Sequence, residues 1–500
     1  MKVKTNHRAL GLGLLIVLVL SACEPSASAA LSSEQPAAPQ GPTDPVGVPS
    51  PTPLPTRQPY PPGTLVDYTA QTGDTLPALA SHFNTTVTEI RQANPILPQD
   101  VTTLPPGLPM KIPIYYQPLW GSPFQILPDS LFVNGPAEVG FDPVAFVDAQ
   151  PGWLKDYTVS TASMSLRGGQ IVQDIATTYS VSPRLLLALL EYQAGALSQP
   201  QPSDPDFPLG YHDSGHHGVY NQLVWAANTL NNGYYGWRIG DLREFDHPDG
   251  RIERPDPWQN AASVALQYYF SKLLDENGFY QATHAQGLLA IYTRLFGDPW
   301  ANVQPHIPGS LVQPALHLPF IPGETWAFTG GPHTGWGLGD PLAAMDFAPP
   351  STAGGCTPSN HWVIAMGDGV IARSSVDGVV LDLDGDGDER TGWEIFYLHL
   401  ATQDRVKAGT KVKVGDPLGH PSCEGGEATG THVHIARKYN GEWIPATGPL
   451  AFNLEGWIAQ AGAQPYEGTL QRFSQVVRAC TCSDSSTNIS SDVALPQAGS

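Results

Sequence analysis

The last third of the chain is a succession of short apolar runs separated by glycine turns, and this pattern restricts it to antiparallel β structure. The run at 362–374 predicts a hairpin, and the runs within 378–400 predict a further pair of strands. In THVHIA, at 431–436, His432 and His434 alternate with Thr, Val and Ile. Because the side chains of a strand point alternately to its two faces, both imidazoles should project from the same face.

Other side chains of this region could complete a metal site with those histidines. A catalytic zinc ion needs about three protein ligands and one open position for water. His333 and Asp346 lie just before the predicted strands, and His399 alternates with apolar neighbours in Tyr-Leu-His-Leu. An imidazole and a carboxylate from the first segment, together with His434, would supply three ligands.

Three segments of this region resemble the signatures of the lysostaphin-type (LytM-like) zinc endopeptidases of peptidoglycan. They are a His followed by an Asp in MDFAPP, a Y-x-H-L strand and a G-T-H-x-H strand, in the family's order within about 320–460. The resemblance implies three zinc ligands, which are His333, Asp346 and His434. It also implies two histidines that orient the water, shuttle protons and stabilise the tetrahedral intermediate, which are His399 and His432.

The spacing of the first signature departs from the family, in which the His and the Asp stand closer together. Twelve residues separate His333 from Asp346, so an inserted loop would have to bulge out and return the chain to the site. Asp340 is a rival carboxylate within this loop, although the Met-Asp-Phe-Ala-Pro flanks favour Asp346.

Residues 64–116 predict a separate small module. The pattern is a strand, a Gly-Asp turn, two short amphipathic helices and a final strand after Pro106-Gly107. These elements, with Tyr68 and Ile112-Pro113, resemble LysM, a βααβ module that binds glycans containing N-acetylglucosamine. The resemblance implies glycan contacts in the loops after the first strand and after the second helix, at Gly73, Asp74, Thr75, Leu76, Asn94, Pro95 and Ile96.

The middle of the chain, 117–310, predicts an all-α domain. Ser182-Pro183 is a helix start, and the apolar run LLLALLEYQAG follows it. A partly desolvated carboxyl at Glu191 would suit a general acid for glycoside cleavage. The segment faintly resembles lysozyme-like lytic transglycosylases, although their Glu-Ser-Gly is Glu-Tyr-Gln-Ala-Gly here. A glycan-binding or purely structural helical domain is the favoured alternative.

The N-terminus predicts export. A basic segment and a twelve-residue apolar run end in Leu20-Ser21-Ala22-Cys23, which resembles the lipobox of bacterial lipoproteins. The resemblance implies lipidation of Cys23 and anchoring to the membrane; the alternative is an ordinary signal peptide cleaved near 26–30. The Pro- and Ser-rich segment 24–63 should act as a tether.

The chain as a whole is acidic. With 25 Lys+Arg against 46 Asp+Glu, its net charge of −21 argues against a nucleic-acid partner.

Export would allow Cys356, Cys423, Cys480 and Cys482 to form disulfides, but four cysteines allow three pairings.

The acidic segment DLDGDGDERTG, at 382–392, begins like a calcium loop. Its twelfth position is Trp393 rather than Glu. The alternatives are a solvated acidic turn and a Ca²⁺ site, whose ligands would be Asp382, Asp384, Asp386 and Asp388.

Together these patterns predict a multidomain α+β protein with a βααβ LysM module, an all-α middle domain, lysozyme-like in one interpretation, and a mainly antiparallel β metallopeptidase domain. The expected segments are 1–23 (lipoprotein signal and lipobox), 24–63 (linker), 64–116 (LysM), 117–310 (helical), 311–480 (metallopeptidase) and 481–500 (disordered tail). The expected function is zinc-dependent cleavage of the peptide stems or crosslinks of peptidoglycan outside the cytoplasm. The alternatives are a non-catalytic peptidoglycan-binding scaffold or activator of other hydrolases, and transglycosylase activity in the middle domain.

Overall fold

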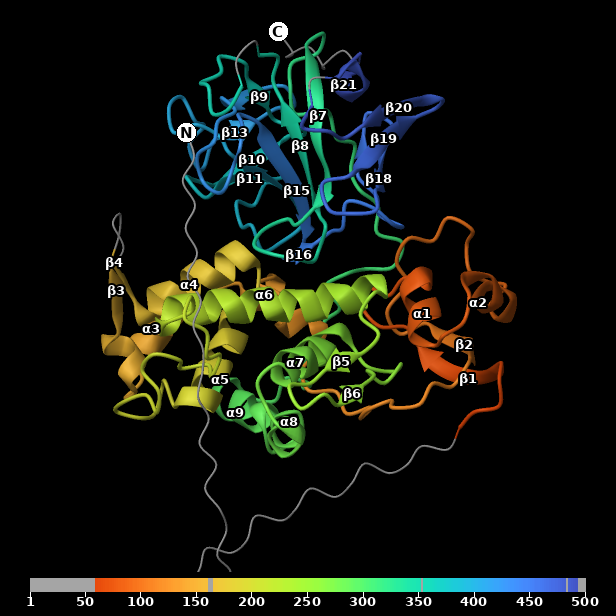
Figure 1. Cartoon of the computed structure of the whole chain (residues 1–500), viewed down its shortest axis with the longest axis vertical. Helices are drawn as coiled ribbons and strands as arrows, with labels where there is room; N and C mark the ends of the chain where they lie inside the picture. Colours follow the sequence, from red (N-terminus) through yellow and green to blue (C-terminus); the bar gives the residue numbers. More distant parts are fainter. Residues whose placement is uncertain (1–58, 161–164, 352–353, 483, 493–500) are drawn as a thin grey trace, which may run out of the picture. The chain divides into compact units, whose positions relative to one another are not determined.

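The computed structural model describes residues 59–160, 165–351, 354–482 and 484–492 (Figure 1). The predicted signal segment with Cys23, and most of the predicted linker 24–63, lie outside the described residues. Within the described part of the chain, none of the helices combines the length and the apolar character needed to cross a membrane.

The first module has the predicted βααβ order. Strands β1 (Thr64–Thr69) and β2 (Pro109–Ile114) pair antiparallel, and helices α1 (Leu76–His82) and α2 (Val87–Ala93) lie between them in the chain. Thr75 and Thr86 cap the two helices, because each side-chain oxygen accepts a hydrogen bond from a backbone amide of the first turn. The predicted βααβ order is thereby confirmed.

The middle region is mainly, but not wholly, helical. Its helices are α3 (Pro143–Asp148), α4 (Gly168–Tyr179), α5 (Pro183–Ala194), α6 (Gly218–Ile239), α7 (Ala261–Ser271), α8 (Glu276–Ala282) and α9 (Leu288–Phe296). Short 3₁₀ turns are η1 (Asp129–Leu131), η2 (Pro136–Glu138) and η3 (Trp153–Asp156). Two short strand pairs interrupt the predicted all-α pattern, β3 (Thr158–Ser160) with β4 (Ser165–Arg167) and β5 (Phe245–Asp246) with β6 (Ile252–Glu253).

The C-terminal region contains a nine-stranded antiparallel sheet, in the order β13-β10-β11-β12-β15-β8-β7-β21 with β16 beside β15. The strands are β7 (Thr325–His333), β8 (Ala344–Ala348), β10 (Gly369–Ser375), β11 (Gly378–Asp382), β12 (Trp393–Leu398), β13 (Lys411–Val412), β15 (Val433–Tyr439), β16 (Glu442–Trp443) and β21 (Asn488–Ser490). The predicted pairing of the runs within 378–400 is confirmed, because β11 pairs with β12.

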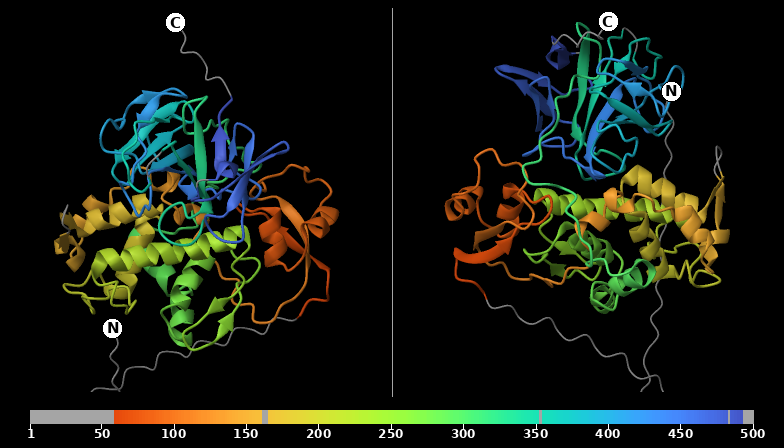
Figure 2. Two further views of the ribbon diagram at one scale, coloured as in Figure 1. Left: turned by 45° about the horizontal axis from the view of Figure 1, so that its top comes forward. Right: turned by 180° about the vertical axis from the view of Figure 1, so that it is seen from behind.

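Smaller groups of strands accompany the large sheet. A four-stranded sheet is formed by β17 (Asn453–Leu454), β18 (Trp457–Ala461), β19 (Gly468–Arg472) and β20 (Gln475–Arg478). Strands β18 and β19 contact β7, and they lie beside it in both views of Figure 2. A last pair is β9 (Val363–Ile364) with β14 (Pro417–Gly419).

Two sequence-based expectations need correction here. The run at 362–374 is not a hairpin: β9 pairs with β14, whereas β10 pairs with β11 and β13, because the two halves of the run enter different sheets. Residues 481–500 were expected to form a disordered tail, yet within it η4 (Ser485–Thr487) leads into β21, which pairs with β7. Burial of Ile489 under the sheet stabilises this strand.

The large sheet buries both of its faces. Val433 and Ile435 of β15 belong to a core with Trp326 and Phe347 of the same domain. Ala436, on the opposite face, lies in a buried cluster that continues into the helices of the middle region. The face that carries His434 is therefore the one toward the helices.

Candidate metal centre

Three adjacent strands bring the predicted metal ligands together. His333 ends β7, Asp346 lies in β8 and His434 lies in β15. The register pairs His434 with Asp346 across β15 and β8, and Gly330 with Asp346 across β8 and β7. A side chain on Gly330 would place its Cβ 2.4 Å from Asp346 Oδ2, so this glycine leaves the space that the carboxylate occupies.

The inserted loop between the first two ligands leaves the sheet and returns to it. It is held by helix α6, where the amide of Leu338 donates to Asn228 Oδ1 at 2.8 Å and that of Asp340 donates to Asn232 Oδ1 at 2.7 Å. The rival carboxylate, Asp340, thus lies at the helix and not with the histidines. The long spacing is accommodated without displacing Asp346.

The three ligand atoms converge on one point. His333 Nε2 and His434 Nδ1 are 3.0 Å apart, and each lies 3.3 Å from Asp346 Oδ1. All three residues are buried. Burial alone would raise the pKa of the Asp346 carboxyl, but the His333 and His434 rings lower it well below its usual range.

The hydrogen bonds around these residues show that the group fits a cation. His333 Nδ1 donates to Gly331 O at 2.8 Å, and His434 Nε2 donates to Gly335 O at 3.1 Å. With the ring protons on these two nitrogens, His333 Nε2 and His434 Nδ1 each carry a lone pair. Asp346 Oδ1 has no hydrogen-bond partner among the described residues. Two imidazole lone pairs and a carboxylate oxygen directed at one point suit zinc, whose ligands are held by outer hydrogen bonds of this kind.

His399 and His432 lie beside this group as a second pair of imidazoles. Their ring centroids are 4.4 Å apart, and His432 Nε2 is 3.7 Å from Asp346 Oδ1. Each Nδ1 donates to a backbone carbonyl, that of Glu424 at 2.8 Å and that of Gly430 at 2.7 Å. Burial, reinforced by His432, lowers the pKa of His399 to about 4. Because each Nδ1 carries its ring's proton, both Nε2 atoms carry a lone pair.

The backbone at His399 is held in a conformation that non-glycine residues rarely adopt, with φ of 64°. Ser422 fixes it, because its amide and its hydroxyl both donate to His399 O, at 2.7 and 2.9 Å. Such local strain, maintained by surrounding hydrogen bonds, sets the direction of the imidazole.

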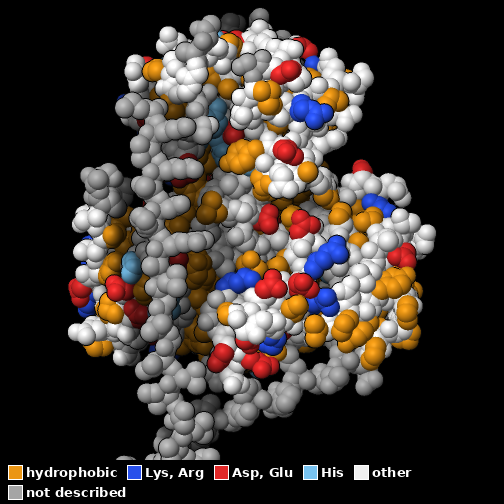
Figure 3. All heavy atoms as spheres, in the orientation of Figure 1, with side chains coloured by type: hydrophobic (Ala, Val, Ile, Leu, Met, Phe, Trp, Pro, Cys, Tyr) orange, Lys and Arg blue, Asp and Glu red, His pale blue; other side chains and the backbone are white. Residues whose placement is uncertain are grey.

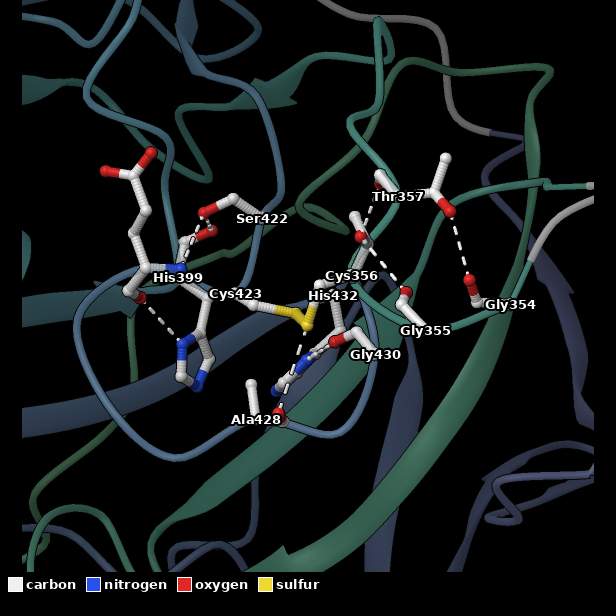
Figure 4. Close-up of a disulfide and its surroundings, with 12 residues drawn as sticks. Gly354, Gly355, Cys356, Thr357, His399, Ser422, Cys423, Ala428, Gly430 and His432 are labelled. Carbon is white, nitrogen blue, oxygen red and sulfur yellow. Dashed lines mark hydrogen bonds between the residues drawn. A yellow bond between two sulfur atoms is a disulfide. The ribbon is translucent and has the colours of Figure 1, made fainter.

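A disulfide between Cys356 and Cys423 supports the segments that carry this pair (Figure 4). Cys423 follows Ser422, which bonds His399, and Cys356 follows Gly355, whose carbonyl accepts from the amide of Thr431 at 3.0 Å. The bond therefore joins the supports of His399 and His432. Of the three pairings that the sequence allowed, the structure has this one, with Cys480 bonded to Cys482.

The site opens into a cavity of about 1950 Å³. All five residues line it: His333, Asp346, His399, His432 and His434. The inserted loop forms one wall and the segment 426–431 another, and Tyr179 and Asn228 of the helical region also line it. The imidazoles are therefore accessible from this cavity.

One residue of the site was not anticipated from the sequence. Tyr466 lies in the link between β18 and β19, and its ring stacks on His333 with centroids 4.1 Å apart. It contacts the outer side of a ligand ring and lines the cavity. It stands 133 positions from His333 by residue number and in no recognisable motif, so only the fold could show it.

The predicted glycan contacts of the LysM module fall into two groups. Gly73 and Leu76 are buried, and the guanidinium of Arg238 occupies the space beside Gly73. Asp74 accepts from the Tyr68 hydroxyl, and burial raises the pKa of its carboxyl to about 6. In contrast, Pro95 is exposed and Ile96 is 84% exposed.

Two further predicted residues have structural roles. The Asn94 side chain bonds the carbonyls of Ile90 and Lys111 and the Lys111 amide, at 2.7 to 2.9 Å, and so ties α2 to β2. Glu191 is buried, and its oxygens bind Arg294 and the Leu197 amide. A carboxyl with both oxygens engaged at a helix end argues against the predicted general acid.

The predicted acidic loop is only partly available to a cation. Oxygens of Asp382, Asp384 and Asp386 lie within 4.8 Å of one another. Asp388 instead forms a two-pronged ion pair with Arg390, at 2.7 and 2.6 Å, and does not belong to this group. On the face drawn in Figure 3, acidic and basic side chains are interspersed without a continuous basic patch.

Two family models and several known proteins match parts of this chain. The family described as LasA, N-terminal domain, matches residues 125–309, and the LysM domain matches residues 68–113. Protease LasA of Pseudomonas aeruginosa is 27% identical over 373 residues, which are 69% of this chain and 81% of that protein. The beta-lytic metalloendopeptidase of Achromobacter lyticus is 29% identical over 168 residues, which are 32% of this chain and 41% of that protein.

A second beta-lytic metalloendopeptidase, from Lysobacter enzymogenes, is 27% identical over 168 residues, which are 32% of this chain and 86% of that protein. Among solved structures, the M23 metalloprotease pseudoalterin from the deep sea is 24% identical; the match covers 34% of this chain and 96% of that one, with a TM-score of 0.29.

Proposed function

We propose that this chain, a LytM-like metalloendopeptidase that carries a LysM module, uses zinc to cleave the peptide stems or crosslinks of peptidoglycan. The observation that carries the proposal is the convergence of two imidazole lone pairs and an unpartnered carboxylate oxygen beside a second pair of histidines. His333, Asp346 and His434 would hold the zinc. Bound there, it would supply Lewis acidity and a water acidic enough to ionise near neutral pH.

The remaining histidines move protons. Because each Nδ1 is committed to a backbone carbonyl, His399 and His432 present Nε2 to the cavity. One of them accepts the proton of the attacking water and then delivers it to the leaving amine. The other donates a hydrogen bond, once protonated, to the oxygen that gains negative charge. The wall formed by the inserted loop positions the peptide across them.

The LysM module would hold the enzyme on glycan strands. Its loop at Pro95 and Ile96 is the most exposed part of the predicted glycan site. We further propose that the protein is exported and anchored through lipidated Cys23, with 24–63 as a tether. The apolar run that ends at Cys23 supports export and anchoring, and the Pro- and Ser-rich composition of 24–63 supports a tether.

A digest of purified, cross-linked peptidoglycan tests the function. The full chain is incubated with the polymer, with and without a zinc chelator, and the products are scored for new free amines and for anhydro-muramyl ends. We expect amines that the chelator abolishes and zinc restores. Binding to the polymer without any cleavage would contradict the proposal and favour a non-catalytic scaffold. Anhydro ends would restore Glu191 as a candidate acid.

A further inference from the structure

The link between β11 and β12 gathers carboxylates in an arrangement that the peptidase site does not use. Asp382 ends β11, and the following turn curls back over it with positive φ at Gly385 and Gly387. The Asp382 carboxylate accepts from three amides, those of Asp384 at 2.9 Å, Gly385 at 3.1 Å and Gly387 at 2.6 Å. The loop is thus wrapped around one buried carboxylate.

Two more carboxylates approach Asp382, and neither has a basic partner among the residues that the structure describes. Oxygens of Asp384 and Asp386 lie within 4.8 Å of Asp382 and of each other. The neighbouring cations pair with other carboxylates: Arg390 pairs with Asp388, and Arg373 and Lys438 both pair with Glu389. Three carboxylates held this close repel one another strongly unless a cation or a proton lies between them.

A fourth carboxyl, Glu394, provides an independent observation. It is 0% exposed, and neither of its oxygens has a hydrogen-bond partner within the described part of the chain. The sheet register places it directly opposite Asp382, so the two side chains share one face with Cβ atoms about 5 Å apart. Lys438 stands opposite Glu394 on the other side but reaches Glu389, at 3.1 Å.

A buried, unpartnered carboxylate is costly, and this side chain must be neutralised. Burial raises the pKa of Glu394 to about 10, against the pull of Lys438 and with the help of Asp382. The Glu394 carboxylate can be neutralised in two ways. It can take up a proton, which then has no acceptor to bond, or it can share a cation with the carboxylates of the loop. The shared cation also removes the repulsion among those carboxylates.

We propose that Asp382, Asp384 and Asp386, with Glu394 behind them, bind one divalent cation of the Ca²⁺ class. Hard oxygen donors in a glycine-bent loop are the ligands this class of ion prefers. A helical calcium loop ends on a glutamate at its twelfth position, where this chain has Trp393. Glu394, one position later and on a returning strand, supplies the missing carboxylate. The ion would close the β11–β12 link, five residues before His399.

Calorimetric titration of the zinc-loaded full chain with CaCl₂ tests the site. Terbium luminescence excited through tryptophan is a second readout, because Trp393 adjoins the loop. We expect one Ca²⁺ per chain, a higher Tm in CaCl₂ than in NaCl of equal ionic strength, and at least tenfold weaker binding for Asp386→Asn. Asp404→Asn, an exposed aspartate that loses the same charge, is the matched control and should bind normally.

Glu394→Gln separates the two states of that carboxyl. The amide of Gln needs no proton to be buried, so this variant should raise the Tm of the Ca²⁺-free chain while Ca²⁺ binding falls at least tenfold. Unchanged Ca²⁺ affinity in this variant would overturn the role of Glu394, and absence of binding to the wild-type chain at millimolar Ca²⁺ would overturn the site. The titration is repeated in His434→Ala. Equal binding there supports a site separate from the histidines, whereas loss of binding would place the ion at the peptidase centre and overturn the proposal.

Discussion

At the scale of single residues, His434 carries the clearest test of the metal centre. His434→Ala removes one of three converging donors and leaves the Asp346 carboxylate and the His333 ring with a vacant position between them. We expect bound zinc to fall from about one per chain to a small fraction and peptidoglycan cleavage to fall at least a hundredfold. Atomic emission measures the bound zinc, and the release of free amines measures cleavage. Full zinc occupancy in the variant would show that the ligand assignment is wrong.

His399 should behave differently, because it lies beside the metal group and does not belong to it. His399→Ala should keep its zinc but lose activity by about 10² to 10⁴, the usual contribution of a general acid or base. His361→Ala is the control, since that half-buried ring contacts Glu324 and not the metal ligands. If His399→Ala lost its zinc together with its activity, His399 would be a metal ligand and not only a proton carrier.

At the scale of elements, the disulfide between Cys356 and Cys423 joins the segments that support His399 and His432. It closes a 67-residue separation, for which the loop-entropy account gives about 4 kcal/mol of stabilisation. The double change Cys356→Ser with Cys423→Ser should lower the Tm and reduce activity about tenfold or more while zinc stays bound. The matched control replaces Cys480 and Cys482, whose bond spans two positions. Equal activity in both double variants would show that the histidines need no such support.

The β11–β12 link should also make the stability of the peptidase domain depend on pH. Burial would raise the pKa of Glu389, but Lys438 and Arg373 lower it to about 2 from an ordinary value of 4.5. The pKa of Glu389 is lower in the folded state than in the unfolded state. The ionised carboxylate therefore stabilises the fold above about pH 4.5, and this stabilisation is lost as the pH falls toward 2. The contribution is on the order of 3 kcal/mol.

Urea unfolding at a series of pH values, without added Ca²⁺, measures this dependence. Glu389→Gln should lower the free energy of unfolding at pH 6 and flatten its decline between pH 4.5 and 2. A variant that is as stable as the wild type at pH 6, and equally acid-sensitive, would exclude the ion pairs as the cause.

Strand periodicity is local to a few residues, whereas the partner of each strand is set by the whole fold. Alternation in THVHIA predicted the shared direction of His432 and His434, because a strand fixes it within a few residues. The same kind of pattern misassigned 362–374, since periodicity shows that a strand exists but not which partner it takes. Tyr466 on His333 could not be predicted at all, because a hairpin far along the chain supplies it.

At the scale of the whole molecule, a buried ion-pair network links three regions. Arg238 at the end of α6 contacts Glu442 of β16 and Asp129 of η1, both at 3.1 Å, and His306 contacts Glu442 at 2.7 Å. Its guanidinium also donates to the carbonyl of Thr72 in the LysM module. These residues lie up to 370 positions apart by number, so only the folded chain could reveal the network.

Arg238→Met should therefore be strongly destabilising, since it leaves two carboxylates buried without their cation. We expect a loss of about 3–5 kcal/mol, measured as a shift of the urea midpoint, with loss of a single cooperative transition as the regions separate. Arg478→Met, at an exposed position, is the control. A midpoint unchanged in Arg238→Met would show that the regions fold without this link.

The pairing of β21 with β7 has a practical consequence for anyone who shortens this protein. β7 is the strand that ends at His333, and β21 covers its outer edge at Trp326. A truncation at residue 480, where the sequence alone would place the end of the domain, strips that cover and exposes a row of unpaired amides and carbonyls. Such an edge invites a second molecule to add its own strand, so the shortened enzyme should aggregate where the longer one stays dispersed.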